Sequence, residues 1–257
     1  MEISSSVLSA AGFALVIAFI FSMFGQGGGS LYSPVLFLLG YSVAHSTSTS
    51  LVLVFITSVS AGYIFYREKL IDYKTSFIFA PGISIGAFIG GTLSQTMDSY
   101  YLMWIFVIFL LFLGARMVFS FWEEKEVVAN IPRQLSRPMY ALIAVVGLAI
   151  GFMAGLLGIG GGLFLVPFMV YIAKFPLKIA AGSSHLIISF SALAGILGHA
   201  TSHQFDISLV VVTGLAVLLG GNLGARVSMK INTGALKAGL GLIMWAFAAQ
   251  ILFKLVG

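Results

Sequence analysis

The chain has 257 residues, of which 60% are hydrophobic and 8% charged, and its mean hydropathy is +1.09. Soluble globular domains carry roughly a quarter charged residues, so this composition excludes a soluble domain and indicates a protein embedded in the lipid bilayer. The absence of cysteine excludes disulfides and thiolate metal sites, and we expect neither a cofactor nor a bound metal. The formal net charge of +5 does not require a nucleic-acid partner, because membrane proteins carry excess Lys and Arg in their cytoplasmic loops.

Apolar segments predict an all-α membrane protein in two similar halves. Each half contains, in chain order, a long segment, a short segment and three further long segments. They are Val7–Phe24, Ser30–Leu39, Thr49–Tyr66, Thr75–Ser94 and Tyr100–Phe121, then Met139–Leu157, Leu163–Ala173, Ser184–Ala200, Ile207–Val227 and Ala235–Leu255. A crossing needs about 20 apolar residues, so the two short segments are too short to cross alone and predict half-helices.

A glycine-rich break before each short segment marks an internal repeat. The first break is Gly25-Gln26-Gly27-Gly28-Gly29, followed by Pro34, and the second is Gly158-Ile159-Gly160-Gly161-Gly162, followed by Pro167. Every matched position in the two breaks is offset by 133 residues, and further positions match at nearly the same offset. We therefore predict two membrane repeats, residues 1–121 and 139–257, joined by a polar linker at residues 122–138.

Two topologies fit this repeat. If each break is a kink within one crossing helix, the repeats are parallel, and the 13 Lys and Arg residues divide 8 to 5 between the two sides of the membrane. If the segments on either side of each break form a re-entrant hairpin, the repeats are inverted, and the same residues divide 12 to 1. Cytoplasmic loops carry the Lys and Arg excess, which favours two inverted repeats, each a re-entrant hairpin plus three transmembrane helices. This arrangement places the linker in the cytoplasm and both termini outside.

In the hairpin arrangement both breaks lie near the membrane midplane, and the half-helices point their N-termini at the centre from opposite sides. A helix N-terminus offers unpaired N–H groups and about half a positive charge, and glycine lets the backbone approach a ligand closely. Two converging N-termini therefore predict an anion site that needs no arginine. The alternative, compatible with the first, is that the glycines only permit chain reversal or close helix packing. The candidate residues are Gln26, Gly27, Gly28, Gly29 and Ser30 in the first break, and Gly160, Gly161 and Gly162 in the second.

Polar clusters open the next crossing in each half. The candidates are Thr47, Ser48, Thr49 and Ser50 in the first half, and Ser183, Ser184 and His185 in the second. Hydroxyls and helix-start amides can bind an oxyanion while staying neutral, and the alternative is ordinary N-capping. His185 is interpreted either as a proton carrier or as a neutral side chain bonded to a hydroxyl or carbonyl, and the second interpretation is favoured.

A few more polar residues lie at or within the crossings. Asp72 and Asp206 stand just before a crossing and predict N-caps. Asn222, deep in a crossing of the second half, needs a partner from a neighbouring helix or from the substrate. Arg226, one turn beyond it, is either a snorkelling anchor or a group that attracts anions to the inner mouth.

The motif Gly-Xaa-Gly-Gly-Gly, a Pro five residues later and a Ser/Thr-rich helix start, once per half, resembles the sulfite exporter TauE/SafE family. Residues 25–51 and 158–186 carry the resemblance most specifically, and the length and duplication extend it over nearly the whole chain. It implies secondary transport of sulfur-containing anions such as sulfite, thiosulfate or organosulfonates across the cytoplasmic (inner) membrane.

The resemblance leaves several alternatives open. Ser184-His185 departs from the family's pattern in the expected substrate path, so the exact anion is open. A coupled proton or ion, the direction of transport and the oligomeric state are also open, and an uncoupled anion channel on the same scaffold is the alternative function. An enzyme is disfavoured, because none of the eight acidic residues lies in the middle of an apolar segment.

Overall fold

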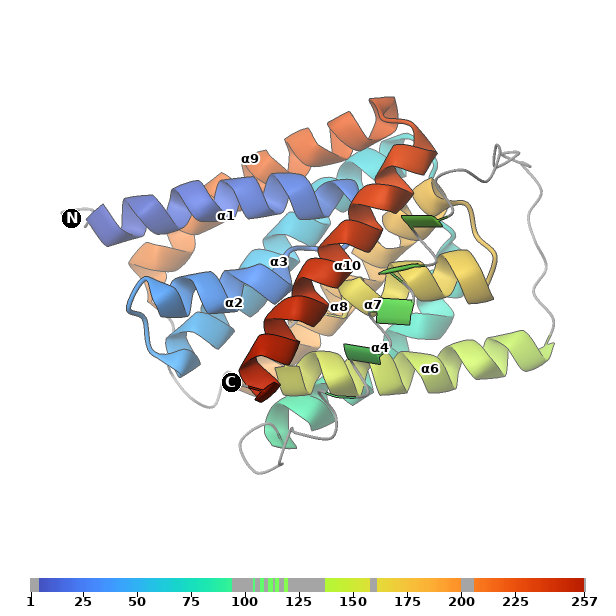
Figure 1. Cartoon of the computed structure of the whole chain (residues 1–257), viewed down its shortest axis with the longest axis horizontal. Coiled ribbons are helices and arrows are strands. Elements are labelled where there is room, and N and C mark those ends of the chain that lie inside the picture. The colour runs from blue at the N-terminus through green and yellow to red at the C-terminus, as the bar shows by residue number, and fades with distance from the viewer. Residues whose placement is uncertain are drawn as a thin grey trace.

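The computed structural model describes residues 5–93, 137–157, 161–199 and 206–256, together with isolated positions between 104 and 119. Over this part of the chain all regular secondary structure is helical, as predicted. The helices are α1 (Ser5–Met23), α2 (Gly29–Leu38), α3 (Val43–Arg67), α4 (Tyr73–Leu93), α6 (Arg137–Leu157), α7 (Gly162–Pro167) with the π-helical turn η2 (Phe168–Ile172), α8 (Leu177–His199), α9 (Ile207–Lys230) and α10 (Thr233–Val256) (Figure 1). The predicted linker at 122–138 lies outside the described residues except for its last two positions, which begin α6.

Among the described residues, six helices are long and apolar enough to cross a membrane: α1, α3, α4, α6, α8 and α9. The segments Gly29–Leu38 and Gly162–Ile172 are shorter apolar helices, as the two half-helix predictions require. With 19 residues, α1 extends over about 28 Å, which is close to the thickness of the hydrocarbon core. This is longer than expected for a hairpin arm that ends at the midplane, so α1 must be tilted or must extend beyond the hydrocarbon core if its end lies there.

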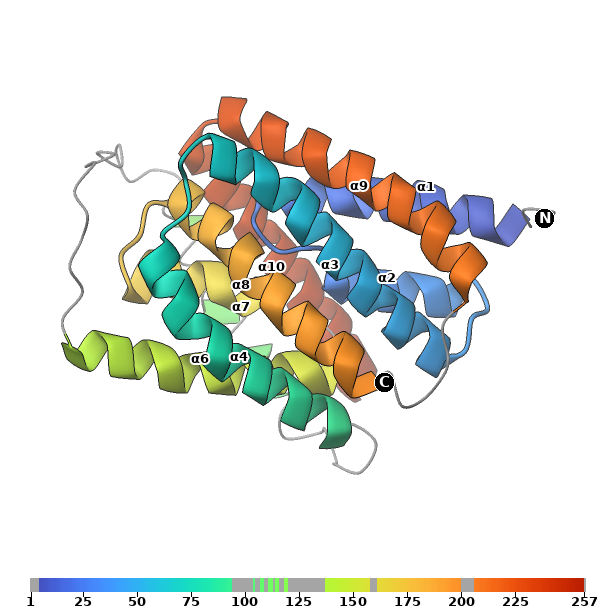
Figure 2. The ribbon, with the colours of Figure 1, turned by 180° about the vertical axis from the view of Figure 1, so that it is seen from behind.

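The helices that precede the two breaks enter the molecule from opposite ends. Figure 1 shows α1 running inward from the N-terminal end, with α2 turning back beside it. It shows α6 running inward from the other end, with α7 and η2 turning back in the same way. Seen from behind, α3 and α8 run through the molecule between these two pairs (Figure 2).

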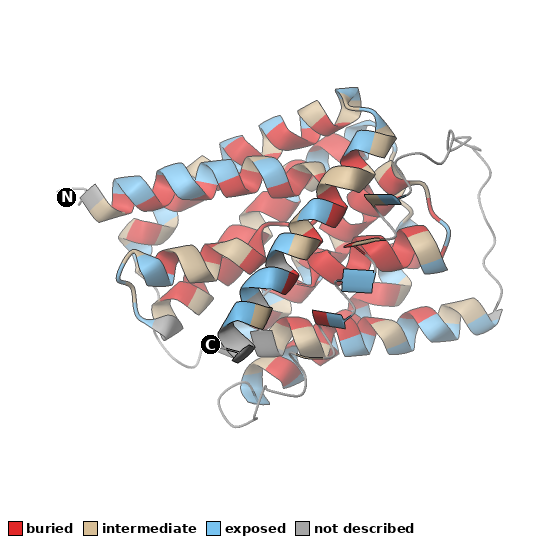
Figure 3. Ribbon diagram, in the orientation of Figure 1, coloured by how far each residue is buried: buried red, intermediate tan, exposed pale blue. Residues whose placement is uncertain are grey.

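Helices α3 and α8 form the centre of the bundle. In their apolar stretches 61% of the residues are buried, against 28% to 44% in the other four long helices. Figure 3 shows the corresponding difference, with exposed residues along the outer faces of α1, α6 and α9. Mostly buried helices that are hydrophobic on all sides belong to the core of the fold. Side chains between α3 and α8 are therefore shielded from lipid.

Each inward-running helix packs against a helix of the other half of the chain. The α1 helix packs along α9, and α6 packs along α4. In both pairs glycines let the backbones meet: side chains at Gly220 and Gly224 would clash with the carbonyl groups of α1, and side chains at Gly151 and Gly155 would clash with those of α4. Small residues spaced four apart are typical of such close packing in membranes. The glycines of the crossings therefore join the two halves.

Two predicted helix starts were wrong. The α3 helix begins at Val43, six residues before the predicted Thr49, and α8 begins at Leu177, seven residues before the predicted Ser184. Ser42 is the N-cap of α3, and its hydroxyl accepts from the His45 amide at 3.3 Å. The polar clusters therefore lie inside helices, where hydroxyls can bond backbone carbonyls, and N-capping does not explain them. Hydropathy marks where an apolar run begins, not where a helix begins.

The predicted aspartate caps are confirmed. The Thr75 amide donates to Oδ1 of Asp72 at 2.7 Å, and the Leu209 amide donates to Oδ1 of Asp206 at 3.0 Å. Both carboxylates satisfy amides that have no partner within their helix.

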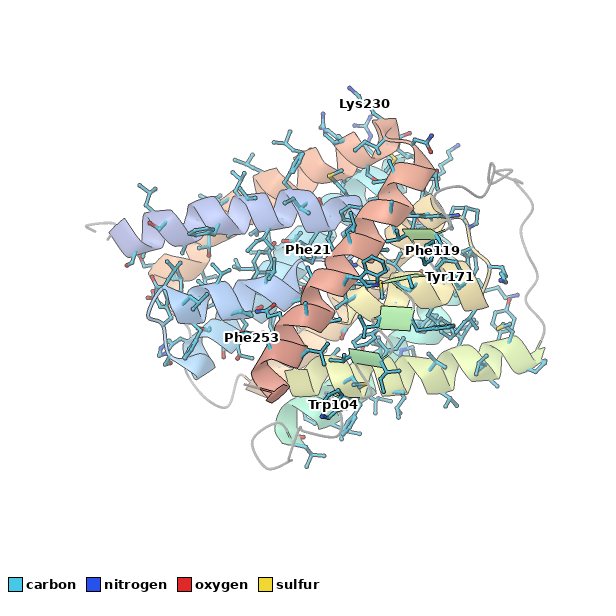
Figure 4. The ribbon with its side chains drawn as sticks, viewed as in Figure 1. Phe21, Trp104, Phe119, Tyr171, Lys230 and Phe253 are labelled. Atoms are coloured by element: carbon cyan, nitrogen blue, oxygen red, sulfur yellow. The ribbon has the colours of Figure 1, made fainter. Side chains whose placement is uncertain are left out.

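Basic residues gather at one end of the molecule. Arg67 ends α3, Lys74 and Lys178 lie in the first turn of α4 and α8, and Lys230 ends α9. These helix ends lie on the same side of the molecule as the start of α6 (Figure 2). Figure 4 shows Lys230 at the outer end of α9, whereas Phe21, in the last turn of α1, lies towards the middle.

Candidate binding site at the glycine breaks

The two breaks share one backbone conformation. Gly28 (φ 82°) and Gly161 (φ 75°) are both left-handed residues that precede the first turn of the helix. The Leu31 amide donates to the Gly28 carbonyl at 3.1 Å, and the Phe164 amide donates to the Gly161 carbonyl at 3.2 Å. Only glycine adopts this conformation without strain, which explains the matched glycines. Gly160 lies outside the described residues.

The two breaks also touch each other. A Cβ on Gly162 would lie 2.5 Å from the carbonyl oxygen of Gln26 and 2.7 Å from its Cα. Residues 136 positions apart in the sequence therefore meet at backbone distance, and only a hydrogen fits between them. The helix starts of α2 and α7 are neighbours as a result.

One face of α8 covers the first break. The hydroxyl of Ser184 donates to the Gly25 carbonyl, and Nε2 of His185 bonds to the Ser22 carbonyl at 3.1 Å. One turn further on, the side chain of Ile188 packs against both Gly27 and Gly162. The predicted bond of His185 to a carbonyl is present, and because a carbonyl oxygen can only accept, Nε2 carries a proton.

One face of α3 covers the same break from the other side. The Ser50 hydroxyl donates to the Gly29 carbonyl at 3.3 Å, and two turns later the Ser58 hydroxyl lies against Gly27, 2.8 Å from where a Cβ would be. Tyr32, in the half-helix α2, bonds through its hydroxyl to that of Thr57 at 2.9 Å. Ser58, Thr57 and Tyr32 were absent from the predicted site. Ser50, Ser58 and Gly62 are separated by eight and four residues and so lie on one helical face, which is a sequence signal for Ser58 but not for Thr57 or Tyr32.

Other predicted residues have different roles or positions. Ser183 accepts from the Asp72 amide at 2.8 Å and thus fixes the loop between α3 and α4. Asn222 is half-buried on α9, and its partner is Arg226 of the same helix, whose Nε donates to Oδ1 at 2.8 Å. Neither Ser183 nor Asn222 has a described side-chain contact with a break. In α3, Thr47 is half-buried, and Ser48 and Thr49 are buried. Ser30 is buried in the first turn of α2.

Buried polar atoms without a hydrogen-bond partner concentrate at the first break. Within the described part of the chain they are Nε2 and Oε1 of Gln26, Oγ of Ser58, Nδ1 of His185 and, nearer the start of α3, Oγ1 of Thr49. A buried polar group without a partner costs about 1–3 kcal/mol, and native proteins contain few of them. Gln26 is part of the break, Ser58 touches it and His185 bonds to the residue three positions before it. Such a concentration is typical of a site that binds a polar ligand.

Residues 10–251 match the family model "Sulfite exporter TauE/SafE". The chain is 27% identical to the probable membrane transporter protein YunE of Bacillus subtilis over 261 residues, covering 93% of this chain and 95% of that protein. It is also 27% identical to the probable membrane transporter protein MJ0441 of Methanocaldococcus jannaschii, covering 89% of each chain. A similar match, again at 27% identity, links it to the probable membrane transporter protein YfcA of Escherichia coli, covering 85% of this chain and 77% of that one. No solved structure matches.

Proposed function

Because the chain belongs to the sulfite exporter TauE/SafE family, and is thus a multi-pass membrane transporter, we propose that it moves small sulfur-containing oxyanions across the cytoplasmic membrane. The substrate class is sulfite, organosulfonate or thiosulfate, and the protein acts as a secondary transporter, not an enzyme. The observation that carries the proposal is the contact between Gln26, two residues before the N-cap of α2, and Gly162, the first residue of α7, with unpartnered polar atoms beside it.

The proposed architecture is two inverted repeats, residues 1–121 and 139–257, with a cytoplasmic linker at 122–138 and both termini outside. The opposed entry of α1 and α6 supports it, as does the equivalent packing of α1 on α9 and of α6 on α4. The gathering of basic residues at one end agrees with a cytoplasmic end. In this architecture each break with its two flanking helices is a re-entrant hairpin.

The proposed chemistry of the site uses neutral donors and helix dipoles. The amides of the first two residues of α2 and of α7, which runs on into η2, have no partner within their helix and favour negative charge. In the described helices, Asp, Glu, Lys and Arg lie only within two turns of an end, so the proposed donors are neutral groups. Gly27 to Ser30 and Gly160 to Leu163 supply backbone amides, and Gln26 contributes its side-chain amide. Ser50 and Ser184 hold the break through its carbonyls, and His185 bonds the Ser22 carbonyl just before it.

We also assign the remaining predicted residues to the substrate path, although fewer contacts with the breaks support this assignment. Thr47, Ser48 and Thr49 extend the polar face of α3 toward the end where α3 begins. Ser183 and Asn222 lie nearer the opposite end, where they would line an approach to the site. In this proposal alternating access moves the two breaks relative to their covering helices, with or without a coupled proton or ion.

The alternative function is an uncoupled anion channel on the same scaffold. Flux of labelled sulfite into proteoliposomes, measured with and without a pH gradient, separates the two. A saturable flux that responds to an imposed ion gradient supports the transporter. A very high flux without gradient dependence identifies a channel, and the absence of any sulfite or organosulfonate flux contradicts the proposed function.

A further inference from the structure

The unpartnered atoms at the first break include both donors and acceptors of hydrogen bonds. The amide of Gln26 contributes two N–H donors and one oxygen acceptor, and the hydroxyl of Ser58 contributes one donor. Gln26 is 2% exposed and Ser58 is 1% exposed, so water in the bulk does not satisfy these groups. A ligand that pairs with all of them must offer acceptor atoms and at least one donor.

His185 adds a second acceptor. Its Nε2 faces the carbonyl of Ser22 at 3.1 Å and therefore carries the ring proton, which leaves a lone pair on Nδ1 in the neutral ring. Nδ1 has no partner, and the side chain is 0% exposed. The Cβ of His185 lies 3.5 Å from a Cβ position on Gly62, one turn after Ser58 on the same face of α3, so both side chains belong to the same contact between α3 and α8.

The described contacts of His185 are with uncharged groups. Ser22 of α1, Gly62 and Phe65 of α3 are its described neighbours, and the Phe65 ring centroid lies 5.5 Å away. The charged groups on the helices packed around it stand near helix ends. They include Arg67 at the end of α3, Lys230 at the end of α9, and Lys74, Lys178 and Lys237 near the starts of α4, α8 and α10. The Nζ of Lys178 donates to the Met229 carbonyl, and Arg226 donates to Asn222. A site built from neutral groups in a low dielectric accommodates one negative charge far better than two.

We infer that the first glycine break binds its oxyanion as a monovalent, still protonated species. Ser58 and the Gln26 amide nitrogen donate to its oxygens, while Nδ1 of His185 and the Gln26 amide oxygen share its single proton as acceptors. A fully deprotonated dianion has only acceptor atoms, which would oppose both acceptors. For sulfite, which takes up its first proton near neutral pH, the bound form is hydrogen sulfite. The inference rests on the proposed function and narrows its substrate class, because it excludes thiosulfate and organosulfonates, neither of which carries a proton near neutral pH.

The two breaks also differ in the polar side chains that they contribute to the site. The offset of 133 that relates the two breaks pairs Gln26 with Ile159, so the amide occurs in the first break alone. Its Cα and carbonyl are held against Gly162 of the second break, which fixes the backbone from which the amide extends. The second break thus positions the first.

Counterflow of labelled sulfite in proteoliposomes tests the inference, with equal pH on both sides, in mildly acidic and mildly alkaline buffers. The apparent affinity for total sulfite should rise in acid in proportion to the protonated fraction, while sulfate and thiosulfate should compete poorly in both buffers. Competition by methanesulfonate, an unprotonated monoanion in both buffers, controls for an effect of pH on the protein. An affinity for sulfite that does not rise in acid, equal competition by thiosulfate, or a parallel rise for methanesulfonate overturns the inference. If sulfite is transported but one of these outcomes is found, only the inference fails and the proposed function stands. If no sulfite is transported, the proposed function itself is contradicted.

Single substitutions test the proposed hydrogen-bond donors and the proposed acceptor Nδ1 of His185 separately. Ser58→Ala and Gln26→Met should each weaken sulfite affinity about tenfold, because a hydrogen bond to a charged ligand is lost. His185→Gln retains an amide N–H for the Ser22 carbonyl but has no atom in the place of Nδ1, so it should also lose the preference for the acidic buffer. Ser189→Ala, on α8 one turn after His185, removes a hydroxyl that bonds the Leu186 carbonyl of its own helix at 2.7 Å and is the matched control. An unchanged pH preference in folded His185→Gln contradicts the role of Nδ1.

Discussion

Ser228 of α9 donates a hydrogen bond to the carbonyl oxygen of Met23, the last residue of α1, at 2.8 Å. The neighbouring carbonyls of Ser22 and Gly25 are bonded by His185 and Ser184 of α8. A helix leaves its last four carbonyls without partners, and here side chains from the second half of the chain supply them. The end of α1 is thus capped by residues about 160 to 205 positions later in the sequence.

This capping predicts that Ser228→Ala destabilises the protein by about 1 kcal/mol, because it leaves the Met23 carbonyl without a partner. Thermal unfolding in detergent measures the effect. Ser189→Ala is the control, since its hydroxyl bonds only within its own helix and should change the midpoint less. Equal midpoints for the two variants would argue against the capping role.

The left-handed glycines predict a loss of transport on substitution. Gly28→Leu and Gly161→Leu place a side chain where φ is 82° and 75°, which costs about 1–2 kcal/mol locally and displaces the amides at the helix start. We expect sulfite flux in proteoliposomes to fall to background. Gly12→Leu is the control, because a Cβ there meets nothing within 4 Å. Normal flux in a well-folded Gly28→Leu protein would refute the assignment of the site.

The packing of each inward-running helix on the other half predicts that neither half is stable alone. Residues 1–121 expressed without residues 139–257 lack α9, the partner of α1, and the second half lacks α4, the partner of α6. Each half should be degraded or aggregate when expressed separately, and the two should co-purify when expressed together. Gly224→Leu in the full chain should have a related effect, since its side chain would clash with the Phe19 carbonyl. A first half that folds stably alone would contradict this interdependence.

The proposed topology predicts the accessibility of single cysteines, which are clean probes because the chain contains none. Val128→Cys in the linker should resist an impermeant thiol reagent applied to intact cells and should react in inverted vesicles. Ser5→Cys, at the start of α1, should show the opposite pattern. Labelling of Val128→Cys from outside would exclude inverted repeats with a cytoplasmic linker.

The sequence was sufficient to predict the kinds of elements and the two breaks, because hydropathy and glycine are local signals. Long apolar runs became α1, α4, α6 and α9 with ends within three residues of those predicted. The starts of α3 and α8 were missed because hydroxyl-rich turns have low hydropathy although they are helical. Which helices pack together is a long-range property, so the pairing of α1 with α9 had no signal in periodicity alone.

The candidate site was predicted in part for the same reason. The glycines and His185 stand out by residue type in an apolar chain. Ser58 does not, because Thr57 and Ser60 lie beside it and its type alone does not distinguish it from them. Its role depends on Gly27 being brought to it from 31 residues earlier. Asn222 stood out by type but is partnered within its own helix, since Arg226 is one turn away.

The pairing of α1 with α9 has a consequence for the biosynthesis of the protein. The first residue of α9, Ile207, is translated 184 residues after Met23, the last residue of α1. At about 5–20 residues per second, α1 waits roughly 10–40 seconds for this partner. During that interval the face of α1 that later meets Gly220 and Gly224 must contact lipid, another helix or the insertion machinery. We therefore expect the slowest step in making this transporter to be the formation of the contact between α1 and α9, because α1 must stay in the membrane until α9 has been translated.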